Sequence, residues 1–432
     1  MSPALIGSLG LLALFVLVLL HIPLGFALAL VGIVAFALQT SWGPALTFLA
    51  SEPVQVLGSV DLAAVPMFLM MGAFVSAAGF SKDLYTAAAA LLGHRRGGLA
   101  YATLGGSATF GAICGSSPAT VATFTRIALP EMLQRGYEPG FSGATIAAGG
   151  ALKALIPPSL SMILYCVVAQ VYIFDIFLAA VVPAIMTLMA NFLAVWLIAR
   201  TLNSPAPAGP AITREEKIAA LWDAGPAIGL ILVVFVGLYS GVFTVNEAAA
   251  VAAVLSFLCL VFRHGFAVDL ILRAFIDTAA VAGMIYVVLI GSAVFTYFIS
   301  LAHLPEIIVG SVTAVDLPPP MIIGMILVIY LVLGAVFDEL AAMVVTVPFA
   351  LPVIVHLGYD PVWWGIINVV IVELGLIIPP VGMVVLIVHG MRPDISLRAL
   401  YRGVAAFVVA DAIVLALLVF FPRLTTWLPG LF

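Results

Sequence analysis

Two short polar segments, each enclosed by apolar sequence, hold residue types that could bind a cation. The first contains Ser116 and Ser117 in the segment GAICGSSPAT, and the second is the pair Asp338 and Glu339. Hydroxyl and carboxylate oxygens are hard ligands that suit a small alkali cation, whereas a transition metal needs clustered Cys or His. The three cysteines have no metal-ligand spacing, so the chemistry of these segments favours an alkali ion.

Each polar segment is followed by a proline pair that interrupts a long apolar run. The sequence IPP occurs at 156–158, within the run 141–171, and again at 378–380, within the run 362–389. Proline removes a backbone donor and clashes with the carbonyl four residues back, so both runs are predicted to be broken helices with free carbonyls. A plain kink would explain one such break, but two in register favour a pair of ion sites.

The proline pairs belong to a phrase that occurs twice, with one constant offset between its two copies. The first copy is LPEMLQRGYEP at 129–139 and the second is LPVIVHLGYDP at 351–361, and each is followed by sixteen residues and then IPP. At this offset Ser116 aligns with Asp338, and Ser117 aligns with Glu339. Matching helix breaks in two halves of a membrane protein indicate a transport site between the halves.

Composition requires a bilayer around these elements. The chain is 65% hydrophobic and only 8% charged, which is too few charges to coat a water-soluble body of 432 residues. A bilayer core about 30 Å thick needs about 20 apolar residues per helical crossing, and the sequence has about ten or more such stretches. We therefore expect an all-α polytopic membrane protein. The net charge of −5 indicates no nucleic-acid partner.

The polar breaks divide the chain into two halves, 1–200 and 224–432, joined by a polar linker at 201–223. The apolar amino terminus continues past His21 and Pro23, so it is predicted to form two spanning helices rather than a signal peptide. Each half should contain a hairpin whose arms are too short to span comfortably, at about 99–133 and about 321–356. Such a re-entrant hairpin is tolerated where its tip lines an enclosed cavity.

Several long segments resemble the large membrane subunit of tripartite ATP-independent periplasmic (TRAP) transporters. The resemblance covers almost the whole chain and is carried by GLAYATLGGSATFGAICGSSPATVATF, LPEMLQRGYEPGFSGATIAAGGALKALIPPSLSMILY, GVFTVNEAAAVAAV and GYDPVWWGIINVVIVELGLIIPPVGMVVLIVHG. It implies an elevator-type carrier with an inverted repeat in the bacterial inner membrane. It further implies sodium-driven import of an organic acid, and no organic cofactor.

The resemblance also implies partners and binding residues. The partners are a periplasmic substrate-binding protein and a small four-helix membrane subunit, which is expected to be separate because 432 residues leave no room for it. The implied ligands of the first sodium ion are Ser116, Ser117, Gly150 and Ile156. Those of the second are Asp338, Thr346, Ile378 and Pro379, and Ser117 and Ser159 would face the substrate.

Two cations depart from the family phrase, because Arg126 and Lys153 stand where a glycine or another small residue is usual. Each could attract a substrate carboxylate or extend to a water-filled crevice, and Lys153 puts an ordinary sodium site nearby in doubt. Glu373 could be a proton or ion ligand, or a helix-packing hydrogen-bond partner. Asp338 has a second interpretation as a hydrated residue at a turn, and Ser116 and Ser117 have one as helix caps.

Other functions predict different features. A stand-alone sodium-coupled carrier of di- or tricarboxylates could share the hairpin architecture. An intramembrane protease would need a GxGD-type aspartyl pair, an HExxH zinc site or a serine with a histidine base, and the sequence has none of these in place, so an enzyme is not expected. A passive channel would not need two proline-broken helices in register.

Overall fold

The computed structural model describes residues 3–201, 206–210, 212–314 and 317–431, and these residues form helices without any strand. Five helices are long and apolar enough to cross a membrane: α10 (Ile173–Thr201), α13 (Val245–His264), α14 (Val268–Leu301), α17 (Glu339–His356) and α20 (Leu397–Phe420). The number rises to eight if each of three bent helix pairs counts as one span. Four further apolar helices are shorter, which explains why run length in the sequence suggested about ten or more crossings. The all-helical membrane fold is thus confirmed.

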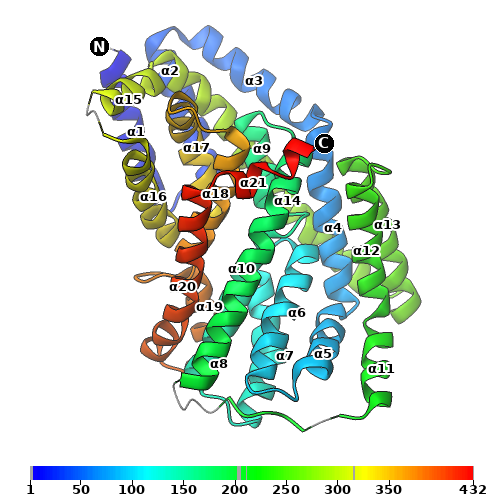
Figure 1. The fold of residues 1–432 in the computed structure, drawn as a ribbon. Coiled ribbons are helices and arrows are strands. Elements are labelled where there is room, and N and C mark those ends of the chain that lie inside the picture. The colour runs from blue at the N-terminus through cyan, green and yellow to red at the C-terminus, as the bar shows by residue number, and fades with distance from the viewer. Residues whose placement is uncertain (1–2, 202–205, 211, 315–316, 432) are drawn as a thin grey trace.

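The helices of the amino-terminal part come first along the chain. They are α1 (Pro3–Leu19), α2 (Leu24–Gln39), α3 (Trp42–Gly58), the short 3-10 helix η1 (Asp61–Ala63), α4 (Ala64–Ala77) and α5 (Phe80–Leu92). In Figure 1, α3 crosses the upper edge of the molecule while α4 and α5 descend beside the central helices. The apolar amino terminus therefore forms two helices separated by a tight break at 20–23.

A compact unit of short helices follows. It consists of α6 (Gly98–Cys114), α7 (Ser117–Gln134), α8 (Pro139–Ala151), η2 (Leu152–Leu155) and α9 (Leu160–Ala169), and it leads into α10. α6 and α7 pack on each other and meet at Gly115, whose φ of +70° is a conformation that favours glycine. The run from α8 to α9 bends by 42° at the proline pair.

The polar segment before residue 224 contains a helix of its own, α11 (Arg214–Asp223). Thr213 accepts a hydrogen bond from the Glu216 backbone N–H, while the Glu216 side chain accepts one from the Thr213 backbone N–H. This reciprocal capping box starts the helix. α11 packs against α5, so this part of the predicted linker is structured.

The carboxyl-terminal part continues with α12 (Gly225–Tyr239), α13, α14, α15 (Leu304–Thr313), α16 (Pro319–Val336), α17, α18 (Pro361–Gly375), α19 (Met383–Met391), α20, α21 (Arg423–Thr426) and η3 (Pro429–Leu431). The offset between the two copies of the repeated phrase also places the series α16 to α20 on the series α6 to α10. Corresponding helix ends agree closely, and α17 coincides with α7 at both ends.

Packing between helices recurs at the same offset. α7 packs on α8 as α17 packs on α18, and α6 packs on α8 as α16 packs on α18. Across the two series, α9 contacts α17 and α19 contacts α7. The second arm of each hairpin therefore lies against the broken helix of the other series, which brings two segments far apart in the sequence together in the middle of the molecule.

Glycines permit close helix packing within each series. A Cβ added to Gly150 of α8 would lie 2.2 Å from Val121 Cγ2 of α7, and a Cβ on Gly375 of α18 would lie 2.6 Å from the Gly334 carbonyl carbon of α16. Both contacts are closer than a real Cβ tolerates, so glycine is required at these crossings.

Candidate functional site

Each hairpin tip is the capped N-terminus of a helix. Ser116 precedes α7, and its Oγ accepts a hydrogen bond from the Ala119 N–H at 3.3 Å. Asp338 precedes α17, and its Oδ1 accepts hydrogen bonds from the N–H groups of Leu340 at 2.8 Å and Ala341 at 3.1 Å. Both side chains satisfy donors that the first turn of a helix leaves free. The interpretation of Ser116 as a helix cap is thus confirmed, whereas the cap role of the equivalent Asp338 was not predicted.

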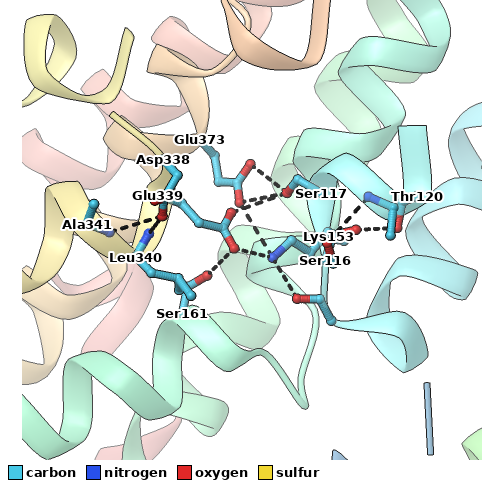
Figure 2. A network of polar contacts seen from close by, with 12 residues as sticks. Ser116, Ser117, Thr120, Lys153, Ser161, Asp338, Glu339, Leu340, Ala341 and Glu373 are labelled. Atoms are coloured by element: carbon cyan, nitrogen blue, oxygen red, sulfur yellow. Dashed lines mark hydrogen bonds and ion pairs between the residues drawn. The ribbon is translucent and has the colours of Figure 1, made fainter. Parts of the chain in front are cut away.

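A buried ion pair joins the first broken helix to the tip of the second hairpin (Figure 2). Lys153 Nζ, from η2, donates to Glu339 Oε1 at 2.7 Å and to the carbonyl oxygen of Gly115 at 3.2 Å. Glu373 of α18 adds a second carboxylate, with its Oε1 3.9 Å from the same ammonium. One ammonium thus contacts a hairpin tip, the start of α17 and the broken helix of the second series.

Two serines complete this cluster. Ser117 Oγ lies 3.2 Å from Glu339 Oε2 and 3.2 Å from Glu373 Oε1, so its hydroxyl can donate to either carboxylate. Ser161, near the start of α9, donates to Glu339 Oε1 at 3.0 Å. Ser117 and Glu339 are separated by the offset of the repeated phrase, so two equivalent positions touch each other. We call Ser117, Lys153, Ser161, Glu339 and Glu373 the central cluster.

The central cluster is almost sealed from the surroundings. The exposed fraction of the side chain is 0% for Lys153, 10% for Glu339 and 8% for Glu373. Ionised side chains at membrane depth are costly unless they are paired, and they usually mark a functional site. In this cluster one ammonium faces two carboxyl groups.

A cavity of about 590 Å³ lies beside the cluster, between the two hairpin tips and the helices α4 and α14. Ser116 and Asp338 line it from the tips, together with Glu339, while Arg273 and Asp277 line it from α14. A second cavity of about 390 Å³ shares Asp338 and lies towards α2. A larger one of about 720 Å³ lies elsewhere, among the loops before α4, α10 and α13, and contains none of the cluster residues.

The sodium ligands implied for the second half differ in burial and in hydrogen bonding. Thr346 is buried, and its hydroxyl donates to the Ala342 carbonyl at 2.6 Å. Ile378 is half-buried and Pro379 is exposed. Within the described residues, no hydrogen bond joins Asp338 to any of these three. The next two carbonyls of this break, at Pro380 and Val381, accept hydrogen bonds from Tyr401 Oη.

The remaining predicted site residues differ in burial and in the contacts that they make. Gly150 packs against α7, and the Ile156 N–H donates to the Lys153 carbonyl at 3.1 Å. Ser159 is buried, and its hydroxyl has no hydrogen-bond partner among the described residues. Arg126 is exposed on α7 and lines none of the three cavities above. The structure therefore brings Lys153 and Ser117 together and leaves Arg126 apart.

Sequence reasoning did not single out Ser161, Arg273 or Asp277, and it gave Glu339 less weight than Asp338. A signal existed for the α14 pair, because Arg273 and Asp277 are charges spaced i, i+4 in a long apolar segment. Ser161 had no comparable signal, because its contact with Glu339 depends on how α9 packs against α17.

An all-helical membrane fold with broken helices and charged residues around an internal cavity defines a polytopic transport protein. The family model described as "Tripartite ATP-independent periplasmic transporter, DctM component" matches residues 11–424. The chain belongs to this family, as the large membrane subunit of a TRAP transporter. The resemblance found in the sequence is therefore confirmed.

Named relatives cover most of the chain. It is 31% identical over 370 residues to the C4-dicarboxylate TRAP transporter large permease protein DctM of Pseudomonas aeruginosa, covering 85% of this chain and 86% of the relative. It is 29% identical to the sialic acid TRAP transporter large permease protein SiaM of Vibrio cholerae, with 95% of each covered. The isethionate TRAP transporter permease protein DctMQ of Oleidesulfovibrio alaskensis is 30% identical, with 98% of this chain and 66% of that longer protein covered.

A solved structure shares the fold. The YdaH transporter of Alcanivorax borkumensis superposes with a TM-score of 0.60, covers 90% of each chain and is 17% identical. At that level of identity the likeness concerns the arrangement of helices alone.

Proposed function

We propose that this chain is the substrate-carrying subunit of a sodium-coupled importer of an organic acid, located in the bacterial inner membrane. A periplasmic binding protein would deliver the acid, and a small four-helix membrane subunit would complete the membrane complex. Transport would proceed by an elevator-type movement of the part that contains the two hairpins. No covalent chemistry on the substrate is proposed.

One observation carries the proposal: both hairpin tips line one internal cavity next to a buried cluster of ionised residues. Non-helical backbone at membrane depth is tolerated where it lines such a cavity. In broken-helix transporters, substrate and coupling ions bind at this kind of place, between the two repeats. The contact between the equivalent residues Ser117 and Glu339 supports a pseudo-symmetric arrangement of those repeats.

Part of the cavity wall suits an anion, while Asp277, Asp338 and Glu339 on the same wall suit a coupled cation. The N-termini of α7 and α17 begin at its wall, and the N-terminus of a helix favours negative charge. Arg273 faces the tips from α14 and supplies a guanidinium that can bind a carboxylate with two hydrogen bonds. The C4-dicarboxylate, sialic acid and isethionate transporters to which the chain is similar are all named for anions. We therefore propose a carboxylate or a related organic acid as the substrate.

Sodium coupling gives the anion its driving force. Moving one net positive charge across the membrane yields about 2.3 kcal/mol per 100 mV. A monoanion accompanied by two or more sodium ions would therefore be drawn inward by a negative interior. Hydroxyl, carboxylate and carbonyl oxygens around the tips have the hardness that sodium prefers.

The test is uptake in proteoliposomes that contain the chain together with the small membrane subunit and the binding protein encoded by neighbouring genes. Labelled C4-dicarboxylate, sialic acid and isethionate would be supplied under an inward sodium gradient and under a matched potassium gradient. We expect uptake of one acid only with the sodium gradient and the binding protein present. Equal uptake under both gradients would refute sodium coupling, and uptake without the binding protein would favour a stand-alone carrier.

A further inference from the structure

We infer that the Lys153 ammonium is a built-in cation that holds the two hairpin tips together, in place of a sodium ion in the first half of the carrier. This inference rests on the proposed sodium-coupled function and changes its ion count. The first half would bind no sodium, and any co-transported sodium would bind elsewhere.

The groups around Lys153 Nζ are those that a bound sodium ion would use. They are the carbonyl oxygen of Gly115 at 3.2 Å, a carboxylate oxygen of Glu339 at 2.7 Å and a carboxylate oxygen of Glu373 at 3.9 Å. They come from three elements: the tip between α6 and α7, the start of α17, and α18. A cation at this point links the hairpins and the second broken helix at once, as Figure 2 shows.

The residues implied as ligands of the first sodium ion are engaged in other contacts. Ser116 Oγ caps α7, and the hydroxyl of Ser117 faces the two carboxylates. Gly150 packs tightly against Val121 of α7 on the side where a Cβ would lie. A sodium ion placed near Ser117 would also be repelled by the ammonium that already binds the same carboxylates.

The two series are built differently at this position. The residue equivalent to Lys153 in the second series is Gly375, where an added Cβ would lie 2.6 Å from backbone of Gly334. In the first series Gly111 lacks a side chain where Lys153 passes, since a Cβ there would lie 2.3 Å from Lys153 Cβ. The backbone thus makes room for a lysine in the first series and excludes any side chain in the second.

A tethered cation has a consequence for coupling. An ion from solution enters and leaves in each cycle, and its gradient contributes energy, whereas the Lys153 ammonium stays attached to the chain. The first half would therefore be clamped at every sodium concentration. Sodium would control only binding outside this cluster.

The experiment measures sodium binding directly. The full chain, with any membrane subunit that co-purifies with it, is placed in lipid nanodiscs, and bound ²²Na⁺ per chain is measured in potassium buffer. In Lys153→Ala, loss of the ammonium opens a space beside two carboxylates, so we expect about one additional sodium ion per chain. Lys153→Arg keeps a cation and should bind as many sodium ions as the wild type, and so should Lys82→Ala, which removes an exposed lysine of α5.

Each outcome decides the inference. A folded Lys153→Ala protein that binds no more sodium than the wild type overturns it, as does a wild-type chain that binds two or more sodium ions. The inference is supported if folded Lys153→Ala protein can be purified in sodium buffer but not in potassium buffer. If the variant folds in neither salt, the count for the wild-type chain decides alone: at most one ion supports the inference.

The uptake assay and the sodium-binding assay together separate this inference from the proposed function. If uptake by the wild type ignores sodium, the sodium-coupled function fails. A gain of one sodium ion in Lys153→Ala would still show that the ammonium occupies a cation site.

Discussion

The helices α6 to α9 and the helices α16 to α19 have matching lengths, order and packing, but they carry different charges. The first unit contributes Lys153, with the hydroxyls of Ser117 and Ser161. The second contributes Glu339 and Glu373. The two units therefore supply opposite charges to one cluster. Within this cluster, the charge from each unit is paired with a charge from the other unit.

This difference follows from the way in which the units cross. Because α17 lies on α9 and α19 lies on α7, side chains of one unit meet side chains of the other in the central cluster. Opposite charges at such a crossing attract, whereas a strictly symmetric pair would place like charges together. The repeated scaffold sets the geometry, and the unequal residues provide the binding chemistry.

Removing the cation of the central cluster should have the largest effect on stability. In Lys153→Met the side-chain volume is kept, but two buried carboxylates lose their counter-charge, a change that costs about 3–5 kcal/mol. We expect a marked drop in the unfolding midpoint in denaturant. Glu339→Gln should cost less, because Glu373 still lies 3.9 Å from the ammonium.

The double variant Lys153→Met and Glu339→Gln completes this experiment. It removes one charge of each sign from the cluster, so we expect it to be more stable than Lys153→Met alone. Additive losses in the double variant would contradict a direct ion pair between the two units.

Another buried contact joins the equivalent helices α10 and α20 through non-equivalent residues. Asn191 of α10 donates to Asp411 Oδ1 of α20 at 2.6 Å, and both side chains are buried. In Asn191→Ala the carboxylate loses a donor, which should lower stability by about 1.5–3 kcal/mol. The measurement is the denaturant midpoint, and the control is Asn191→Leu combined with Asp411→Leu, which leaves no buried polar group unpaired. A single variant as stable as the wild type would mean that this contact does not join the halves.

The tight glycine of the second unit gives a third way to test the comparison. Gly375→Ala places a Cβ 2.6 Å from the Gly334 carbonyl carbon, and the resulting overpacking between α18 and α16 should cost about 1–3 kcal/mol. Gly229→Ala is the matched control, because a Cβ there meets no atom within 4 Å. Thermal unfolding of both variants in nanodiscs measures the difference. Equal stability would mean that the second unit could accept a side chain where the first has Lys153.

Much of the scaffold could be predicted from the sequence. Composition indicated membrane helices, and the paired prolines marked where α8 and α18 end, because proline leaves a break in any apolar run. The helix α11 was missed, although Thr213 and Glu216 have the spacing of a capping box. The polar composition of this segment indicates a linker, but composition does not distinguish a surface helix from a loop.

Less of the candidate site could be predicted from the sequence. Asp338 and Glu339 are adjacent acids, and only the start of α17 separates their roles: the first caps the helix, and the second points to Lys153. Arg126 and Lys153 both depart from the family phrase, but the face of the helix that each occupies depends on packing between the units. These directions are set by contacts between segments that lie far apart in the chain, which local patterns do not contain.

The smallest expected effect on stability distinguishes the two equivalent caps. Asp338→Ala and Ser116→Ala each remove a side chain that accepts hydrogen bonds from the first turn of a helix, and each should cost about 1 kcal/mol. Asp338→Asn keeps a good cap but removes the charge, so its stability should stay close to that of the wild type.

Uptake tells the roles of these caps apart. If Asp338 also binds sodium, as the family resemblance implies, both Asp338→Ala and Asp338→Asn should abolish sodium-dependent uptake, while Ser116→Ala should retain it, because the tethered ammonium already clamps the first unit. Normal uptake by Asp338→Asn would show that this carboxylate serves only as a cap. Sodium would then have to bind at another site outside the central cluster.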